Sequence, residues 1–391
     1  MSGVDQWAEE LRSYGLNNGP DKNVCSIHFS DAAIKIKISR GGFKDCCDYC
    51  GKIRTVMSLE DLMKFLMETV MYYYKDPVDF ASYQDGEYNV DHSESTEILM
   101  GNYGLEIEDG QLSEDIYEWL DPWCAWSDAN SFYGEGQFAR PYSWSHFSYL
   151  IKHQVRYLFY LYKENDNQYS HQSVEVLKEI GRMIKKYNLI RTIEPKTSVY
   201  RCRQHSKSFV VKIAKEISAP EVQYISNPNR FSPAGISMFY CADDKQTAQL
   251  ETVDETWKSS KYTTAKFETK ESIKVVDLTQ LPEFPSVFDQ GKRKIYSDLY
   301  FLTSFIKDLT KPIARDGKVH IDYVPTQVVT EYFRHMFKEQ INGIVYASSR
   351  SRGGKAMVIF YDHYESLTKL EFIDSSVETN NLSKFLKTYS K

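Results

Sequence analysis

No apolar run in the 391-residue sequence approaches the roughly 20 residues that a membrane-spanning helix requires. The first eleven residues carry acids where a secretory signal peptide carries a basic region and an apolar stretch. We therefore expect a soluble, cytoplasmic protein with no membrane partner.

The sequence also lacks an excess of positive charge, because 48 Lys and Arg stand against 54 Asp and Glu, for a formal net charge of −6. Broad nonspecific binding of nucleic acid needs clustered cations that displace counterions from phosphates. Charge therefore argues against nucleic acid as the main partner, although a local basic groove is compatible with it. The aromatic fraction of 14% is high and predicts dense cores and stacking surfaces.

No internal repeat or low-complexity tract is present, and the length predicts two or three domains. The first half shows helical apolar periodicity, with Ser58 and Asp61 forming a capping pair before one such segment. The character changes at Pro195, which precedes a β-branched run over residues 197–200. We therefore place a domain boundary near residue 195.

The fold class that follows is α+β: a mostly helical, zinc-stabilised N-terminal domain followed by a mixed C-terminal domain. The segments expected are an N-terminal helix and linker (1–22), a zinc-knuckle segment (23–52), a helical domain (53–194) and a catalytic domain (195–391). Helices are expected near residues 6–13, 58–76, 96–101, 113–120, 145–162, 173–187, 247–257, 296–309 and 326–338. Strands are expected near residues 237–241, 273–278, 344–346 and 357–361.

The seven cysteines are an odd number and do not form a disulfide framework. Cys25 and His28 form a C-x2-H pair, and Cys47 and Cys50 form a C-x2-C pair. Three thiolates and one imidazole can surround a tetrahedral zinc without an open position for water, so we predict a structural zinc site. Cys46 could replace Cys47 in another register. The plainer alternative is a set of small buried hydrophobic residues with a surface histidine.

Arg140 and His146 have the R-x5-H spacing that resembles the nuclease motif of HEPN-type helical domains. In such a site the arginine would hold a phosphate and the histidine would handle the proton of the 2′-hydroxyl group. Pro141 directly follows the arginine and disfavours a helix there. An RNase site is therefore an alternative to the simpler interpretation, in which this segment is the start of a packed helix.

The strongest chemical signal is the order Arg230, Tyr240, Glu251, placed by the sequence on a turn, a strand and a helix in succession. Cleavage of an N-glycosidic bond to nicotinamide builds positive charge on the ribose, and a dinucleotide also brings a pyrophosphate. Such a site needs a carboxylate at one end and a guanidinium group at the other. A tyrosine offers a face on which the nicotinamide ring can stack. Individually, each residue could equally be an ordinary surface or core side chain.

These residues resemble the RES family, whose Arg, Tyr and Glu have the same intervals of 10 and 11 residues. The family's serine near the end of the domain is matched by Ser348, with Ser349 as the alternative. The segment from Tyr200 to Arg203 opens the domain as the family does, and the resemblance covers about residues 196–370. The first half more loosely resembles the helical N-terminal region attached to some RES domains, with His28 where a Cys is more usual.

The resemblance implies an ADP-ribosyltransferase-like topology and an enzyme that acts on NAD. It implies that Arg230 and an upstream arginine, Arg201 or Arg203, clamp the pyrophosphate. It further implies that Tyr240 stacks on nicotinamide and that Glu251 binds the ribose hydroxyl groups or the developing oxocarbenium ion.

Ser348, or Ser349 beside it in the cofactor site, would orient the ribose or the acceptor. The acceptor that the resemblance implies is phosphate, and water or a macromolecule could use the same electrophile.

The biological role implied is that of a bacterial toxin or antiphage defence effector that depletes NAD under the control of an antitoxin or regulatory protein. An ADP-ribosyltransferase that modifies a macromolecule, an RNase and a noncatalytic binding module are the alternatives. The sequence leaves a homodimer open.

Overall fold

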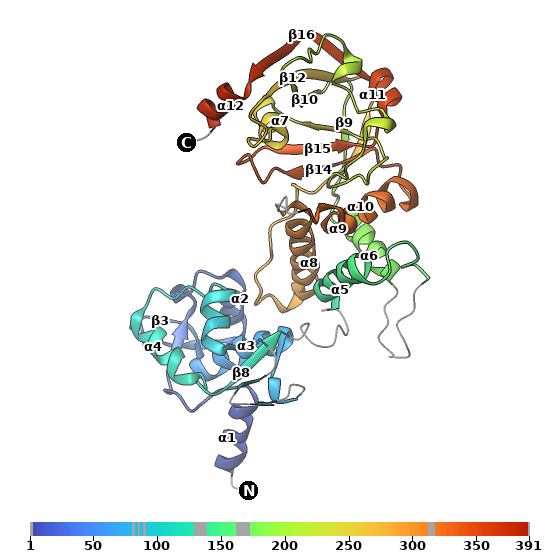
Figure 1. The fold of residues 1–391 in the computed structure, drawn as a ribbon. Helices are drawn as coiled ribbons and strands as arrows, with labels where there is room; N and C mark the ends of the chain where they lie inside the picture. The colour runs from blue at the N-terminus through green and yellow to red at the C-terminus, as the bar shows by residue number, and fades with distance from the viewer. Residues whose placement is uncertain are drawn as a thin grey trace. The chain divides into compact units, whose positions relative to one another are not determined.

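The computed structural model describes residues 3–79, 83–84, 87–88, 91–128, 139–161, 173–311 and 317–389. The chain folds as two compact units (Figure 1), each made of two stretches of sequence. The first unit comprises Met1–Tyr142 and Glu283–Tyr300, and the second comprises Ser143–Pro282 and Phe301–Lys391. In the described ranges, no helix has the length and apolar character needed to cross a membrane.

The first unit combines helices with small antiparallel sheets. Its helices are α1 (Gly3–Ser13), α2 (Ala32–Gly41), α3 (Leu59–Tyr73), α4 (Gly110–Trp119) and a π-helical segment, Glu97–Asn102. One sheet has the order β1-β3-β2, from Asn23–Cys25, Ile53–Ser58 and Phe43–Cys46. A second has the order β4-β8-β7, from Tyr74–Lys75, Ala125–Asp128 and Ser93–Glu94, and β5 (Tyr83–Gln84) pairs with β6 (Glu87–Tyr88).

Helix α3 begins as its sequence predicts, because the Ser58 hydroxyl oxygen accepts the Asp61 N–H at 3.1 Å. Its buried side chains follow helical periodicity and form the centre of the first core. The helix ends at Tyr73, before the predicted stop at Pro77, because Tyr74 already pairs with Asp128 in a sheet. The small sheets were not predicted, since strands of two to six residues leave little periodicity to detect.

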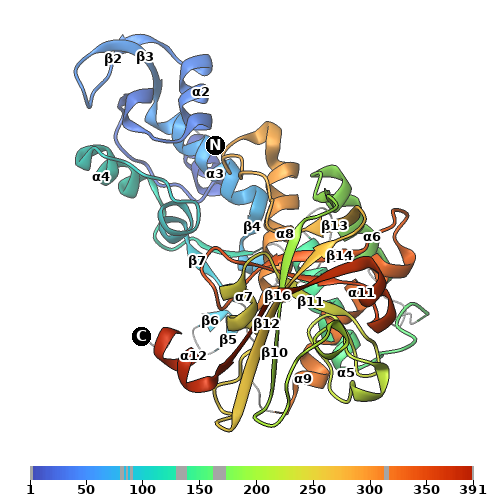
Figure 2. The same cartoon turned by 90° about the horizontal axis from the view of Figure 1, so that it is seen from above.

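The second unit is built on one eight-stranded sheet with the order β16-β12-β10-β11-β15-β14-β13-β9. Its strands are β9 (Ile190–Ile193), β10 (Ser198–Ser206), β11 (Phe239–Ala242), β12 (Ser260–Thr269), β13 (Ile273–Asp277), β14 (Gly343–Ala347), β15 (Lys355–Ile359) and β16 (Leu370–Asn381). Neighbouring strands are antiparallel except β13 and β14, which are parallel. Figure 2 shows β10 and β12 running side by side along this sheet.

Both faces of the central strands are buried. In β14, Ile344 and Tyr346 belong to one core, whereas Val345 between them belongs to the other. In β15, Val358 and Met357 divide in the same way. This period-two alternation with apolar residues on both faces is typical of a sheet covered on both sides.

Helices cover both faces of the sheet. They are α5 (Ala139–His153), α6 (Ser173–Lys186), α7 (Lys245–Thr252), α8 (Arg293–Thr310), α9 (Val319–Asp322), α10 (Val324–Glu331), α11 (His363–Lys369) and α12 (Leu382–Tyr389). A π-helical segment, Tyr332–Met336, continues α10. Helix α7 is shorter than the predicted 247–257, because the chain leaves the helix at Val253 and turns into β12.

Helices α5 and α6 precede the predicted boundary near residue 195 but pack in the core of the second unit. Trp144 is buried there, its indole N–H donates to Asp308 Oδ2 at 3.0 Å, and its ring lies 4.9 Å from that of Phe305. Both helices lie beside α8, α9 and α10 in Figure 1. Helix α5 ends at His153, well before the predicted residue 162. The compact units therefore divide the chain differently from the predicted segments, whose boundaries stay a prediction about families.

Candidate active site and metal centre

Helix α7 carries Glu251 and is fixed at its start by the predicted cap. Asp244 Oδ1 accepts the Thr247 N–H at 2.9 Å, which satisfies one of the free donors of the first turn. The loop after β14 packs against the same turn, because a Cβ atom on Gly354 would lie 2.1 Å from Thr247 Oγ1. Glycine is therefore required at this close approach, and the loop is held next to the helix that carries the carboxylate.

Glu251 and Ser348 are in direct contact. The Ser348 hydroxyl group donates to Glu251 Oε1, while its oxygen accepts the N–H groups of Arg350 at 3.1 Å and Ser351 at 3.0 Å. A serine hydroxyl has one hydrogen and two acceptor lone pairs, so these three contacts orient it completely. The loop therefore holds Ser348 in a fixed position, and Ser348 in turn fixes Glu251.

Tyr240 lies on β11 on the same face of the sheet as Tyr346 of β14. Its hydroxyl group hydrogen-bonds Ser232 Oγ at 2.9 Å and accepts the Phe231 N–H at 3.3 Å. Burial raises the pKa of Tyr240 to about 12, and burial together with the Glu251 carboxylate raises the pKa of Tyr346 further. Both tyrosines therefore stay neutral at physiological pH and present aromatic surface to the site.

Arg230 is half-buried and tied to the end of α8. Its guanidinium group donates to Leu309 O at 2.7 Å and to Lys311 O at 2.9 Å, and lies 5.6 Å from the centre of the Tyr323 ring. Two of its five N–H donors thus satisfy carbonyl groups at a helix C-terminus. The remaining donors keep a fixed position because these two bonds hold the fork.

Arg201 and Arg203 differ in their surroundings, although both lie on β10. Arg201 donates to Ile217 O and Tyr240 O, both at 2.6 Å, and burial lowers the pKa of its guanidinium group to about 10. Arg203 is exposed and donates to Glu216 O. Only Arg201 of the two lines the cavity described next.

A cavity of about 690 Å³ in the second unit brings most of these residues together. Its charged lining divides into two sets: three arginines (Arg201, Arg230, Arg350) and three acids (Glu251, Asp254, Glu255). Aromatic and other groups complete it, including Tyr240, Tyr323, Tyr346, Ser232, Asn229 and Ser349. The cavity can therefore hold a ligand that is anionic over part of its length and develops positive charge near a carboxylate.

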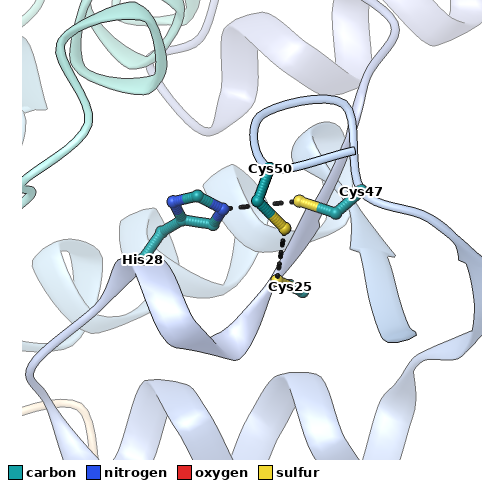
Figure 3. Close-up of side chains that lie close together, drawn as sticks. All are labelled: Cys25, His28, Cys47 and Cys50. Carbon is teal, nitrogen blue, oxygen red and sulfur yellow. Dashed lines mark hydrogen bonds between the residues drawn. The ribbon is translucent and has the colours of Figure 1, made fainter. Parts of the chain in front are cut away.

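The four predicted metal ligands lie together in the first unit (Figure 3). Cys25 ends β1, His28 closes the following 3-10 turn, and Cys47 and Cys50 lie in the turn between β2 and β3. Gly51 has a φ of 65°, which lets the chain reverse directly after Cys50. The sheet thus brings two pairs, separated in sequence, to one place.

The geometry of this cluster fits a tetrahedral ion. Cys25 Sγ and Cys50 Sγ are 3.7 Å apart, Cys47 Sγ and His28 Nε2 are 3.5 Å apart, and the four ligand atoms all lie within 4.8 Å of one another. Zinc bonds of about 2.3 Å to sulfur and about 2.0 Å to nitrogen give tetrahedron edges of roughly 3.5–3.8 Å. Cys46 is exposed and outside the cluster, which decides the register in favour of Cys47. The cluster can bind a metal.

Two family models match the chain. Residues 198–374 match the RES domain, and residues 41–165 match the HEPN/RES N-terminal domain 1. This chain is a RES-domain protein. A comparison with curated proteins gives no match. At the level of the family, a RES domain indicates an enzyme with an NAD-related, toxin-type function.

The RES-domain match contains the whole cavity, and the sequence reasoning missed part of its lining. Tyr346 and Arg350 flank the predicted Ser348, so the same loop carried a signal that could have identified them. Asp254 and Glu255 follow Glu251 just beyond the end of α7. Tyr323 has no sequence signal, because only the fold brings α9 and α10 to the cavity.

The alternative RNase pair falls on α5 in the region of the HEPN/RES match. The helix begins at Ala139, so Pro141 lies in its first turn, where a missing N–H costs nothing. The side chains of Arg140 and His146 lie outside the described residues. The RNase hypothesis therefore stays a prediction from sequence.

Proposed function

We propose that this RES-domain protein cleaves the nicotinamide N-glycosidic bond of NAD, as a phosphorylase or glycohydrolase. The observation that carries the proposal is the contact between Glu251 and Ser348 at a cavity that also contains three arginines. We extend to this unit the ADP-ribosyltransferase-like topology that the family resemblance implies.

Glu251 would stabilise the positive charge that develops on the ribose as nicotinamide leaves. Ser348 gives its only hydroxyl hydrogen to Glu251 Oε1, which leaves Oε2 to face the ribose hydroxyl groups or the oxocarbenium carbon. Because the carboxylate is already oriented, little reorganisation is needed in the transition state. Ser348 acts here through Glu251.

Tyr240 and Tyr346 would supply the apolar surface for the nicotinamide ring. The Tyr240 hydroxyl group is held by Ser232 and Phe231, so its ring rather than its oxygen is available to a ligand. Arg201 and Arg230 would supply fixed positive charge for the pyrophosphate, since main-chain carbonyl groups hold both guanidinium groups in place. Arg203 and Ser349 have weaker support, because Arg203 does not line the cavity and Ser349 is exposed.

Phosphate, giving ADP-ribose 1″-phosphate, and water are the acceptors we propose. Depletion of NAD would make the protein a growth-arresting toxin or a defence effector, controlled by an antitoxin or another regulatory protein.

We further propose that Cys25, His28, Cys47 and Cys50 hold a structural zinc ion. With four protein ligands the ion would cross-link the β1–β3 region and take no part in catalysis. His28 Nδ1 lies 3.7 Å from Asp109 Oδ2, which favours Nε2 as the metal ligand.

The direct test is nicotinamide release from NAD by the purified protein, with and without phosphate, and with RNA integrity read in parallel. Glu251→Gln keeps the shape of the side chain but removes its charge. We expect this variant to keep its fold and most of its NAD affinity, and to lose turnover by at least about 100-fold. Near wild-type release by Glu251→Gln would contradict the assignment, and RNA cleavage without nicotinamide release would favour the RNase alternative.

A further inference from the structure

Three arginines line the cavity, but main-chain groups hold two of them. Arg201 donates to Ile217 O and Tyr240 O, and Arg230 donates to Leu309 O and Lys311 O. Four bonds of 2.6–2.9 Å fix these two guanidinium groups where the backbone needs them. They set the electrostatic potential of the cavity, but neither can move towards a ligand without breaking such bonds.

Arg350 is different. Its side chain is exposed and makes one long hydrogen bond, from NH1 to Val253 O at 3.3 Å. Among the residues that the structure describes, no acid forms an ion pair with it, although Asp254 and Glu255 also line the cavity. Arg350 therefore combines a mobile, weakly engaged guanidinium group with a place in the wall of the site.

The backbone of Arg350 is fixed even though its side chain is not. Its N–H donates to Ser348 Oγ at 3.1 Å, and the same hydroxyl group donates to Glu251. Val253, which accepts the side-chain bond, caps the helix that carries Glu251. The side chain thus starts two residues from the serine that orients the proposed catalytic carboxylate, and it can turn from Val253 into the cavity.

We propose that Arg350 binds the pyrophosphate of the substrate and so sets the preference of this site for phosphate-bearing nicotinamide compounds. The proposal rests on the proposed function, because it uses the same cavity. A planar guanidinium group can hold phosphate oxygens with two parallel hydrogen bonds, which compensates for the single long bond to Val253.

A purely structural role makes a different forecast. If Arg350 only caps helix α7 through Val253 O, its loss disturbs Glu251 and lowers kcat while KM for NAD stays the same. If Arg350 binds phosphate, its loss raises KM and weakens any ligand that carries a pyrophosphate.

The matched control is Arg352, an exposed arginine in the same loop that does not line the cavity. For Arg350→Ala we expect a KM for NAD about tenfold higher with kcat within about twofold of wild type, and a similar loss of affinity for ADP measured by calorimetry. Arg350→Lys should recover part of both losses, since lysine keeps the charge but not the fork. Arg352→Ala should behave as wild type.

Unchanged KM and ADP affinity in Arg350→Ala would overturn the proposal, as would equal losses in Arg352→Ala or a fall in kcat alone. The ADP titration needs no turnover. If the wild type released no nicotinamide, the proposed function would fail, and ADP affinity would still decide the role of Arg350. A wild-type protein that binds no ADP would refute the Arg350 contact outright.

Discussion

The hydroxyl hydrogen of Ser348 is committed to Glu251, and its lone pairs are committed to two backbone N–H groups. The sequence left Ser348 and Ser349 as alternatives for one role, because adjacent serines in a loop are equivalent by pattern. The fold separates them, since Ser348 contacts the carboxylate whereas the exposed Ser349 lies on the cavity wall.

We predict that Ser348→Ala lowers kcat for nicotinamide release by about tenfold or more, because the loss of a hydrogen bond to a charged group frees the carboxylate to rotate. Ser349→Ala is the control and should leave kcat within about twofold. Kinetics of both variants over a range of NAD concentrations give the answer. The opposite ranking of the two variants would transfer the role to Ser349.

Arg230 was predicted as a phosphate contact, and the structure adds a second role at the end of α8. For Arg230→Ala we predict weaker NAD binding on the Glu251→Gln background, together with a loss of about 2 kcal/mol of stability from the two charge-assisted bonds to carbonyl groups. Arg230→Lys should rescue both effects only in part. Thermal unfolding compared with Lys178→Ala, which removes only an exposed pair with Glu175, measures the second effect. Equal melting temperatures in the two alanine variants would exclude the structural role.

At the scale of elements, local signals predicted most of what local chemistry controls. The caps at Ser58 and Asp244 form as their sequence patterns indicate, because a cap needs only residues three positions apart. The ends of α3, α5 and α7 were misplaced, since each is set by what the chain meets next: a paired strand, a turn or the start of β12. Tertiary pairing overrides helix periodicity at those points.

For the metal centre we predict one zinc ion per chain, measured by elemental analysis of protein purified with reductant. Cys47→Ser should abolish zinc binding, because three ligands cannot close the tetrahedron. Cys46→Ser should keep the ion, since that side chain is exposed and lies outside the cluster. Nicotinamide release by Cys47→Ser should persist, because the two units have separate cores. Full zinc content in Cys47→Ser, or its absence from wild type, would refute the site.

At the scale of the whole molecule, the second unit needs helices that lie outside its family match. Helices α5 and α6 bury nine apolar side chains against the sheet: Trp144, Phe147, Leu150, Ile151, Val176, Leu177, Ile180, Met183 and Ile184. At about 1.5–3 kcal/mol each, their burial is as large as the net stability of a typical domain, about 5–15 kcal/mol. The fold of the catalytic unit therefore begins near residue 143.

We predict that a fragment of residues 195–391 does not fold, because its sheet would expose the face that α5 and α6 cover. A fragment of residues 143–391 should fold and release nicotinamide, although it carries 283–300 without their partners. Circular dichroism melting curves and binding of a hydrophobic dye distinguish the two fragments. A cooperative melt from the shorter one would show that the sheet is stable without these helices.

The sequence alone determined the chemistry that local spacing encodes: the Cys25, His28, Cys47 and Cys50 cluster, and the order of Arg230, Tyr240 and Glu251 that indicated the RES family. It could do so because ligand pairs and capping residues lie a few positions apart, and family motifs keep fixed intervals.

Only the tertiary structure decided which arginine remains mobile in the cavity, which serine contacts Glu251, and which helices complete the catalytic core. These outcomes depend on residues such as Leu309, Val253 and Trp144, each far in sequence from at least one partner. Contacts of that kind follow from how the sheet and its helices pack, which no local pattern records.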